Sequence, residues 1–250
     1  MINRIIFAGN NQIAVDILKF LVTQNVKIVG LIIHPEKFSK KGQELVSLCQ
    51  LPKSRIFYGD HLNTPKIIKA IRELKPDLFL SINFRYLLKD EIINIPSYGC
   101  INLHFGYLPY NRGVFADAWS IIDDTPAGVT YHLIDSGIDT GKIVAQLQVE
   151  KLVTDTGKSL YQKLTRTAYN LFVTTWPSIY QWNFSPKNQP AGGTCHKRTD
   201  INDIDFINLE KRYTAKKLIN ILRARTFSPY SGAYFTTQKG KKIYLRLTFH

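Results

Sequence analysis

Short apolar runs alternate with amphipathic segments along the first third of the chain. The runs at residues 4–8, 26–33, 55–58 and 77–82 predict strands, because each is short, mostly apolar and bounded by turn residues. Between them, helical spacing of apolar residues predicts helices over 13–22, over 40–48 and from Pro65, with Thr64 as the predicted cap of the last helix. This β-α-β alternation is typical of a parallel sheet.

The same patterns continue to the end of the chain. We expect a strand over 96–105, a helix that carries Trp119, β-structure over 129–133 and 142–151, and a long helix after Gly157. Nearer the C-terminus we expect a helix capped by Thr214 and then a hairpin, with its turn at 238–241 and its returning strand at 242–247. A segment rich in Pro, Asn and Gly at 183–193 predicts a boundary between a catalytic domain, 1–182, and a C-terminal subdomain, 183–250. The predicted fold is therefore α/β: a Rossmann-like, mostly parallel twisted sheet with helices on both faces, plus a small C-terminal helix and β-hairpin module.

Three polar residues have a pattern that suits acyl transfer to an amine. Strand alternation places Asn102 and His104 on one face, at the carboxyl end of their strand, and the turn at 135–141 can return Asp139 to the same place. An amine acceptor needs no protein nucleophile, but it needs donors for the developing oxyanion and a route for its proton. His104 and Asn102 can supply the donors, and Asp139 can orient the imidazole and move the proton. Alone, each motif is more often a strand edge or a plain turn.

The segment from residue 100 to 144 resembles the folate-dependent formyltransferases, namely methionyl-tRNA formyltransferase, glycinamide ribonucleotide transformylase and the sugar-nucleotide N-formyltransferases. Their pattern is Asn-x-His-x-x-x-Leu-Pro, an Arg-Gly with a Trp-bearing helix, and Asp-x-Gly-x-Asp-Thr-Gly. The matching residues are Asn102, His104, Leu108, Pro109, Arg112, Gly113, Trp119, Asp135, Gly137, Asp139, Thr140 and Gly141. The sequence departs from the pattern at Gly106, where Ser is commoner, and at Ala116, where Pro is common. The resemblance covers about residues 2–180.

The resemblance implies a formyl donor and two sets of contacts. The donor would be N10-formyltetrahydrofolate, and its predicted contacts are Phe84, Leu87, Asp135, Gly137 and Ile138. The turn after the first strand meets substrate phosphate in the resembled transformylases, which makes Asn10, Asn11 and Gln12 candidates for substrate binding. Arg85, after the strand at 77–82, can offer a cation to a phosphate. Core packing for Phe84 and Leu87, and a solvated surface position for Arg85, remain the alternatives.

The C-terminal segment resembles only the sugar-nucleotide branch of these enzymes. Phe227 and Tyr230 could stack on a base, and Arg223 and Arg225 could meet phosphates; a core-capping hairpin is the alternative. There is no room for the added β-barrel of methionyl-tRNA formyltransferases. The predicted acceptor is thus the amine of a nucleotide-linked amino sugar, such as dTDP-4-amino-4,6-dideoxyglucose, for surface polysaccharide (O-antigen) biosynthesis. Methionyl-tRNA, glycinamide ribonucleotide and water (a deformylase) remain alternative acceptors, and a basic RNA-binding module is the non-enzymatic alternative.

Charge, cysteine content and hydropathy limit the partners and the location that we expect for the protein. The formal charge of +14 over 250 residues is dispersed and carries no nucleic-acid motif, so a polyanionic small-molecule substrate explains it as well, and no nucleic-acid partner is expected. Three isolated cysteines without metal spacing indicate reduced thiols and no metal site, as in a cytoplasmic protein. No apolar run reaches the roughly 18 residues of a membrane span, so no membrane insertion is expected. A homodimer is compatible with these features.

Overall fold

A seven-stranded sheet, with strand order β3-β2-β1-β4-β5-β7-β8, is the framework of the protein. The computed structural model describes residues 1–249. The strands of this sheet are β1 (Ile5–Gly9), β2 (Ile28–Ile33), β3 (Ile56–Tyr58), β4 (Leu78–Ile82), β5 (Cys100–His104), β7 (Ala127–Leu133) and β8 (Ile143–Val149). Strands β1, β2 and β4 are buried along their whole length, which accounts for their continuous apolar sequences.

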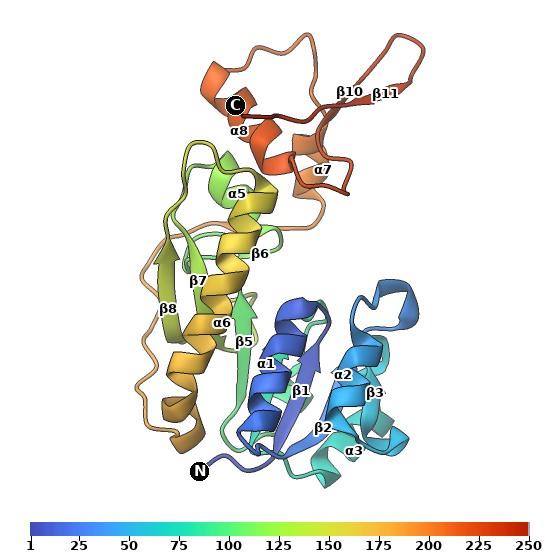
Figure 1. The fold of residues 1–250 in the computed structure, drawn as a ribbon, viewed down its shortest axis with the longest axis vertical. Coiled ribbons are helices and arrows are strands. Elements are labelled where there is room, and N and C mark those ends of the chain that lie inside the picture. The colour runs from blue at the N-terminus through green and yellow to red at the C-terminus, as the bar shows by residue number, and fades with distance from the viewer. Residues whose placement is uncertain (250) are drawn as a thin grey trace. The chain divides into compact units, whose positions relative to one another are not determined.

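The direction of pairing changes once within the part of the sheet that carries the predicted site. β3, β2, β1, β4 and β5 pair in parallel, whereas β7 runs antiparallel to β5. The carboxyl ends of the parallel strands lie at one edge of the sheet, where open α/β folds bind ligands. The predicted α/β sheet is confirmed (Figure 1).

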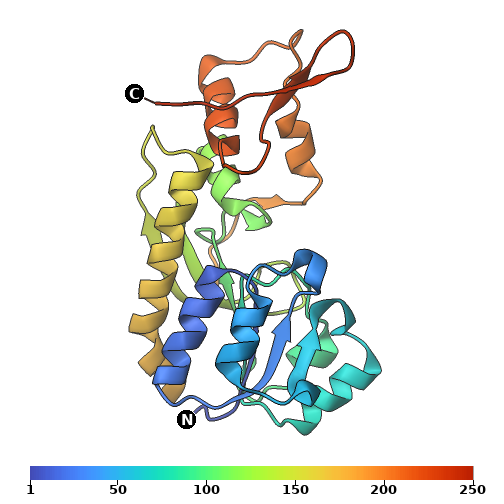
Figure 2. The ribbon, with the colours of Figure 1, turned by 45° about the vertical axis from the view of Figure 1, so that its right-hand side comes forward.

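Helices cover both faces of the sheet. The α-helices of the described residues are α1 (Gln12–Thr23), α2 (Gly42–Cys49), α3 (Pro65–Glu73), α4 (Asp90–Ile93), α5 (Ala116–Ile122), α6 (Gly157–Gln181), α7 (Asp200–Asp205) and α8 (Ala215–Arg225). α1 and α6 lie side by side on one face (Figures 1 and 2), where Phe20 meets Phe172 edge-on at 6.1 Å and the Tyr131 hydroxyl donates to the Ala168 carbonyl at 2.9 Å. On the opposite face Ile71 of α3 and Ile92 of α4 pack in one buried cluster with Ile6 of β1 and Phe79 of β4.

The chain forms two compact units, both discontinuous in sequence. Unit 1 comprises residues 1–104, 130–145 and 168–189; unit 2 comprises 105–129, 146–167 and 190–250, described to residue 249. Unit 2 contains two small two-stranded sheets, β6 (Arg112–Gly113) with β9 (Cys195–His196) and β10 (Tyr234–Thr236) with β11 (Lys242–Tyr244). Its C-terminal core gathers around Ile207, Ile221 and Ala233. The boundary at residue 183 stays a prediction.

Two local expectations change, and one is confirmed. Thr64 occupies the cap position of α3, but its hydroxyl donates to the His61 carbonyl at 2.8 Å and does not cap the helix. The predicted returning strand at 242–247 ends at Tyr244. Thr214 does cap α8, because its hydroxyl oxygen accepts from the Lys217 N–H at 3.2 Å. The small β6–β9 sheet pairs residues more than 80 positions apart, so no local pattern predicts it.

Candidate active site

Polar side chains cross three neighbouring strands of unit 1 in one row. The register pairs Ser81 of β4 with Asn102 of β5, and Asn102 with His132 of β7. Paired residues project from the same face of a sheet, so a hydroxyl, an amide and an imidazole stand next to one another. Two residues earlier on β4 and β5, the same face carries Phe79 and Cys100, which belong to the buried cluster under α3 and α4.

His104 and Asp139 complete a four-residue cluster with Asn102 and His132. His104 lies two residues beyond Asn102 and therefore on the same strand face. Its Nδ1 is 3.4 Å from Oδ2 of Asp139, and the Asn102 amide Nδ2 is 3.5 Å from Oδ1 of the same carboxylate. The structure thus brings together the three residues predicted to be catalytic. The His104 and Asp139 side chains are only 7% and 16% exposed.

The loop that carries Asp139 is held by its own side chains and by a distant residue. The Asp135 carboxylate accepts from the Gly137 N–H at 3.1 Å and from the Thr140 hydroxyl at 2.6 Å, which closes the turn. Asp139 itself has a left-handed backbone, with φ 51°. Gln189 donates its amide to the carbonyls of Asp139 at 2.7 Å and Gly141 at 2.8 Å. Asp135 and Gln189 therefore fix the backbone that carries the Asp139 carboxylate.

His132 is a member of the cluster that sequence reasoning missed. Its Nδ1 is 2.8 Å from the Leu133 carbonyl, which can only accept, so Nδ1 carries a proton. In the neutral ring Nε2 is then an acceptor, and it receives the Asn102 amide at 3.2 Å. Asp139 Oδ1 lies 3.3 Å from the same Nε2 and would pair with it if the ring were protonated. The alternation of Thr130 and His132 with buried apolar residues in β7 was the available signal.

The cluster contains no activated nucleophile of the protein's own. Cys100, the cysteine nearest in sequence, is buried on β5 with its thiol 3.7 Å from the Ile93 carbonyl. Burial raises the pKa of Cys100 to about 12, so the thiolate is absent at neutral pH. This places Cys100 in the core, as expected for a small buried apolar residue.

The predicted folate contacts fall into two groups. Leu87 and Ile138 are large apolar side chains in loops of unit 1, 70% and 47% exposed. Phe84 is half-buried and packs against His34 and Tyr86, with ring centroids 5.2 and 5.4 Å away. Asp135 and Gly137 form the turn described above.

The predicted substrate contacts of unit 1 surround the first β-α turn. The buried Asn10 side chain donates to the Phe38 carbonyl at 3.2 Å and accepts from the Lys40 N–H at 2.9 Å, so it fastens the segment after β2. Asn11 is the cap residue of α1, and Gln12 begins the helix and donates to Asp16 at 2.9 Å. The Arg85 guanidinium lies 4.0 Å over the Phe38 ring.

In unit 2, both predicted phosphate-binding arginines have partners within the fold. The Arg223 guanidinium is buried and donates to the carbonyls of Leu152 and Asp155, at 3.0 Å each. Arg225 forms a two-point ion pair with Asp205, with Nη2 2.9 Å from Oδ2. These contacts stabilise unit 2 and leave neither guanidinium directed at a ligand.

The two predicted stacking aromatics, Phe227 and Tyr230, are neighbours in unit 2. Their ring centroids are 5.3 Å apart, and Phe227 also contacts Tyr161 at 5.5 Å. Tyr230 is 49% exposed, whereas Phe227 is half-buried. Tyr230 is thus the more accessible of the two for stacking.

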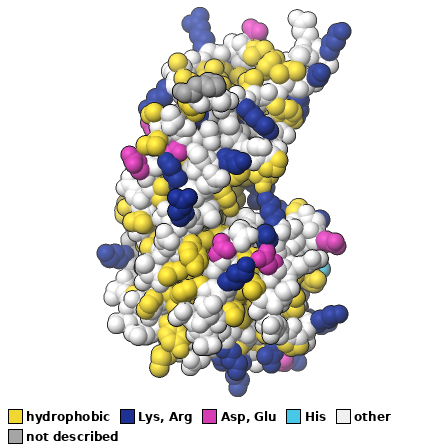
Figure 3. Space-filling model, viewed as in Figure 1, with side chains coloured by type: hydrophobic (Ala, Val, Ile, Leu, Met, Phe, Trp, Pro, Cys, Tyr) yellow, Lys and Arg dark blue, Asp and Glu magenta, His cyan; other side chains and the backbone are white. Residues whose placement is uncertain are grey.

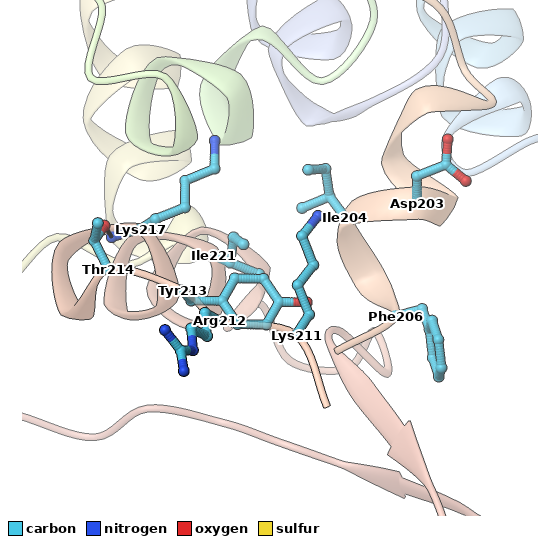
Figure 4. Close-up of a pocket in the computed structure, with 9 residues that line it drawn as sticks. All are labelled: Asp203, Ile204, Phe206, Lys211, Arg212, Tyr213, Thr214, Lys217 and Ile221. Carbon is cyan, nitrogen blue, oxygen red and sulfur yellow. Dashed lines mark hydrogen bonds between the residues drawn. The ribbon is translucent and has the colours of Figure 1, made fainter. Parts of the chain in front are cut away.

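A cavity of about 300 Å³ lies elsewhere in unit 2, between α7 and α8 (Figure 4). Nine residues line it: Asp203, Ile204, Phe206, Lys211, Arg212, Tyr213, Thr214, Lys217 and Ile221. None of them is among the residues predicted to bind the donor or the acceptor.

The basic side chains are dispersed on the face of the molecule that Figure 3 draws. On the face drawn in Figure 3, Lys and Arg side chains are scattered singly or in small groups and form no continuous basic stripe. Among residues 1–249, no helix is long and apolar enough to cross a membrane, and no group of three or more His, Cys, Asp or Glu could hold a metal ion.

Comparison with known proteins matches both parts of the chain. The family model described as formyl transferase matches residues 3–176, which include Asn102, His104 and Asp139. The model described as N-formyltransferase dimerization C-terminal domain matches residues 200–250, which include the lining of the unit 2 cavity.

Similar proteins include both tRNA and sugar enzymes. The methionyl-tRNA formyltransferase of Thermodesulfovibrio yellowstonii is 29% identical over 254 residues, covering 97% of this chain and 80% of that protein. The structure of a sugar N-formyltransferase from Shewanella sp. superposes with TM-score 0.86 at 25% identity, covering 99% of this chain and 98% of that one. A formyltransferase from Anoxybacillus kamchatkensis, solved with UDP-4,6-dideoxy-4-formamido-L-AltNAc and tetrahydrofolate, is 29% identical with TM-score 0.60, covering 80% and 89%.

Proposed function

The chain belongs to the formyl transferase family, and we propose that it transfers a formyl group from N10-formyltetrahydrofolate to the amine of a nucleotide-linked amino sugar. The observation that carries this proposal is the cluster of Asn102, His104 and Asp139 at the carboxyl end of β5. His104 Nδ1 and the Asn102 amide approach the two oxygens of one carboxylate at 3.4 and 3.5 Å. The residues supply hydrogen-bond donors and a proton acceptor, which are what transfer to an amine requires.

His104 and Asn102 stabilise the charge that develops on the formyl oxygen. Asp139 faces Nδ1 of His104, so Nε2 is the ring nitrogen that meets the reacting group. The Asp139 carboxylate favours the protonated imidazole, and in this mostly buried site the attraction is little screened by water. Asn102 adds its amide N–H as a second, neutral donor. Preorganised donors of this kind usually make the largest single contribution to catalysis.

Asp139 and His104 also move the proton that the reaction displaces. The new bond joins the acceptor nitrogen to the formyl carbon, the bond from that carbon to the donor nitrogen breaks, and one proton passes from the acceptor amine to the departing nitrogen. A carboxylate and an imidazole within 3.4 Å of each other can accept and return that proton. Transfer is direct, because the buried Cys100 thiol, whose pKa is raised to about 12, cannot act as an intermediate carrier.

The residues of unit 1 fit a folate donor. The cofactor supplies an activated formyl carbon on N10, and its pterin ring needs an apolar surface close to polar groups. Leu87 and Ile138 are large apolar side chains exposed to solvent in loops of unit 1, so both are accessible to a bound ring. We propose that Leu87, Ile138 and Phe84 contact the pterin, and that Asp135 and Gly137 shape the loop around it.

An amino-sugar nucleotide is the acceptor we favour over tRNA. Two of the similar structures support it: one is a sugar N-formyltransferase that matches nearly end to end, and the other was solved with a formamido sugar nucleotide. Asn11, Gln12 and Arg85 are the proposed contacts to the diphosphate, and Tyr230 is the proposed stacking partner of the base. The other predicted contacts have partners within the fold, so we propose that they support the contacting residues and do not touch the substrate. They are Asn10, Arg223, Arg225 and Phe227. dTDP-4-amino-4,6-dideoxyglucose is the acceptor to test first.

The acceptor assay separates the candidates. Purified protein is incubated with N10-formyltetrahydrofolate and, in parallel, dTDP-4-amino-4,6-dideoxyglucose, methionyl-tRNA, glycinamide ribonucleotide or buffer alone, and formylated products are identified by mass spectrometry. We expect a formamido sugar nucleotide and no product from the 4-hydroxy analogue, which lacks the amine. Release of formate in buffer alone at the same rate would identify a deformylase, and formyl-methionyl-tRNA as the main product would refute the sugar acceptor. His104→Ala is the matched inactive control.

We propose in addition that residues 200–249 pair with a second copy of the chain. The family model that matches this region describes a dimerization domain, and the region presents a row of aromatic rings. Phe206, Tyr234 and Tyr244 follow one another with centroids 5.8 and 5.7 Å apart, and Phe206 and Tyr244 are exposed. Sedimentation equilibrium should give a dimer for the wild type and a monomer for Tyr244→Lys; a wild-type monomer at micromolar concentration would refute the pairing.

A further inference from the structure

Ser81 is a polar residue in a strand that is otherwise apolar and buried. β4 reads Leu-Phe-Leu-Ser-Ile, and all five residues are buried. A buried hydroxyl is unfavourable unless it makes a hydrogen bond. Its hydrogen-bond partner lies in the candidate site: the Ser81 hydroxyl donates to Oδ1 of Asn102 at 2.8 Å. Neither the family pattern in the sequence nor the proposed chemistry uses this serine.

The hydrogen bonds of the row run in one direction. The Leu133 carbonyl can only accept, so His132 Nδ1 donates to it and His132 Nε2 accepts. Asn102 must therefore present its NH₂ group, not its oxygen, to His132 Nε2 at 3.2 Å. The amide oxygen then points away, toward β4, where Ser81 donates to it. Each atom of the Asn102 side-chain amide has a partner whose chemistry matches it.

The same arrangement sets where the Asn102 N–H groups point. With Oδ1 held by Ser81, Nδ2 lies between His132 Nε2 and Asp139 Oδ1, on the side of the cluster where His104 also lies. Rotating the amide by half a turn would bring Oδ1 against the Asp139 carboxylate and against the acceptor nitrogen of His132. Without the hydroxyl, Oδ1 would lose its donor in a half-buried position, and the amide would be held less firmly in this orientation.

We propose that Ser81 is a positioning residue for the transfer reaction, which holds the Asn102 amide with its NH₂ group, and not its oxygen, on the side of the cluster where His104 and Asp139 lie. This inference rests on the proposed function, since it assigns Asn102 as an oxyanion donor. Ser81 touches neither donor nor acceptor; it acts through Asn102. The effect of losing it is therefore limited by the effect of losing Asn102, which for an oxyanion donor is about 10²–10³ in kcat.

The test compares two variants of equal shape. Ser81→Thr keeps a hydroxyl, Ser81→Val replaces it with a methyl group, and both carry the same added bulk. Ser81→Ala removes the hydroxyl without added bulk, in case neither larger side chain is accommodated. We expect Ser81→Val and Ser81→Ala to lower kcat by about 10- to 100-fold with the KM for both substrates within about twofold of wild type, and Ser81→Thr to retain kcat within a few-fold. Circular dichroism melting identifies variants that have lost the fold.

A double-mutant cycle separates positioning from general structural damage. If Ser81 acts through Asn102, then Ser81→Val should cost almost nothing in the Asn102→Ala background, because the amide it positions is gone. Equal fold-losses in the two backgrounds, or equal kcat for Ser81→Thr and Ser81→Val with both near wild type, would overturn the proposal.

A measurement without substrate keeps this test independent of the proposed function. In protein labelled with ¹⁵N-asparagine, the Asn102 side-chain NH₂ signals should be shifted in Ser81→Val and wild-type-like in Ser81→Thr. Wild-type protein that formylates no amino-sugar nucleotide would refute the proposed function, while these signals would still decide whether Ser81 orients the amide. Unchanged NH₂ signals in Ser81→Val would overturn the positioning role by themselves.

Discussion

The buried imidazole of His34 should make the stability of the protein depend on pH between about 4 and 6.5. His34 ends β2, is almost completely buried, and contacts the rings of Phe84 and Tyr86 at 5.2 and 5.3 Å. Its Nε2 accepts the Arg85 N–H at 3.3 Å, which requires that nitrogen to be unprotonated. Burial is the main cause that lowers the pKa of His34 from 6.5 to about 4; the Arg85 charge acts in the same direction, and a hydrogen bond with the Phe38 backbone opposes them.

The magnitude follows from proton linkage. Below pH 6.5 the unfolded chain binds a proton on this imidazole, whereas the folded protein does not bind it until pH approaches about 4. The free energy of unfolding therefore decreases as the pH falls from 6.5 to about 4, by roughly 1.4 kcal/mol per pH unit once the unfolded group is protonated. The total contribution of His34 is about 3 kcal/mol, fully present above pH 6.5 and lost near pH 4.

Urea unfolding of wild type and His34→Gln at pH 7.5, 6.0, 5.0 and 4.5 measures this contribution. Glutamine keeps an acceptor for the Arg85 backbone N–H but does not titrate. The free energy of unfolding of wild type should therefore decrease relative to that of His34→Gln as the pH falls. His61→Gln is the matched control, because the His61 side chain is 69% exposed and its loss should leave the pH dependence unchanged. Parallel stability curves for wild type and His34→Gln across this range would refute the reasoning.

Three further predictions concern the site. Asn102→Ala should lower kcat by about 10²–10³, and His104→Ala or Asp139→Asn should lower it further, in steady-state assays of folded protein; near-normal turnover of His104→Ala would contradict the mechanism. Gly141→Ala should displace the loop and destabilise the protein, because its Cβ would lie 1.7 Å from a backbone carbonyl oxygen; a variant with wild-type melting temperature and kcat would show that the loop is not constrained there. Tyr230→Ala should weaken binding of the sugar nucleotide by about 1–3 kcal/mol in calorimetry while the folate KM stays constant, and Tyr230→Phe should restore it; equal binding by wild type and Tyr230→Ala would return the ring to a packing role.

Local pattern was sufficient for the framework and for two of the three catalytic candidates. The continuous apolar runs of β1, β2 and β4 are the direct result of burial on both faces, so each could be located within about two residues. Asn102 and His104 are two positions apart on one strand, so period-two alternation alone places them on the same face. The placement of Asp139 rested on the family resemblance, because the sequence of a turn does not show where the turn places a side chain.

Residues that act through long-range contacts could not be predicted. Strand register alone brings Ser81 and His132 to the site. Gln189 belongs to a segment some 50 residues away from the loop that it fastens. Arg223 shows a different limit, since its position in a polar-looking tail favoured a contact with phosphate. The fold buries its guanidinium against two backbone carbonyls, a use that depends on the packing of α8 and leaves no mark on the local sequence.

One face of the sheet explains why the chemistry occurs where it does. Along β5, Cys100 lies in the apolar cluster, Asn102 lies in the polar row, and His104 lies beyond it beside Asp139. Each step of two residues along β5 therefore leads from the buried apolar cluster to the polar groups at the carboxyl end of the strand. Because the antiparallel strand β7 follows the parallel set, it brings His132 to the same row and delivers Asp139 at the edge. The carboxylate thus acts on His104 from a mostly buried position, where an opposite charge at 3.4 Å has a much larger effect than it would in water.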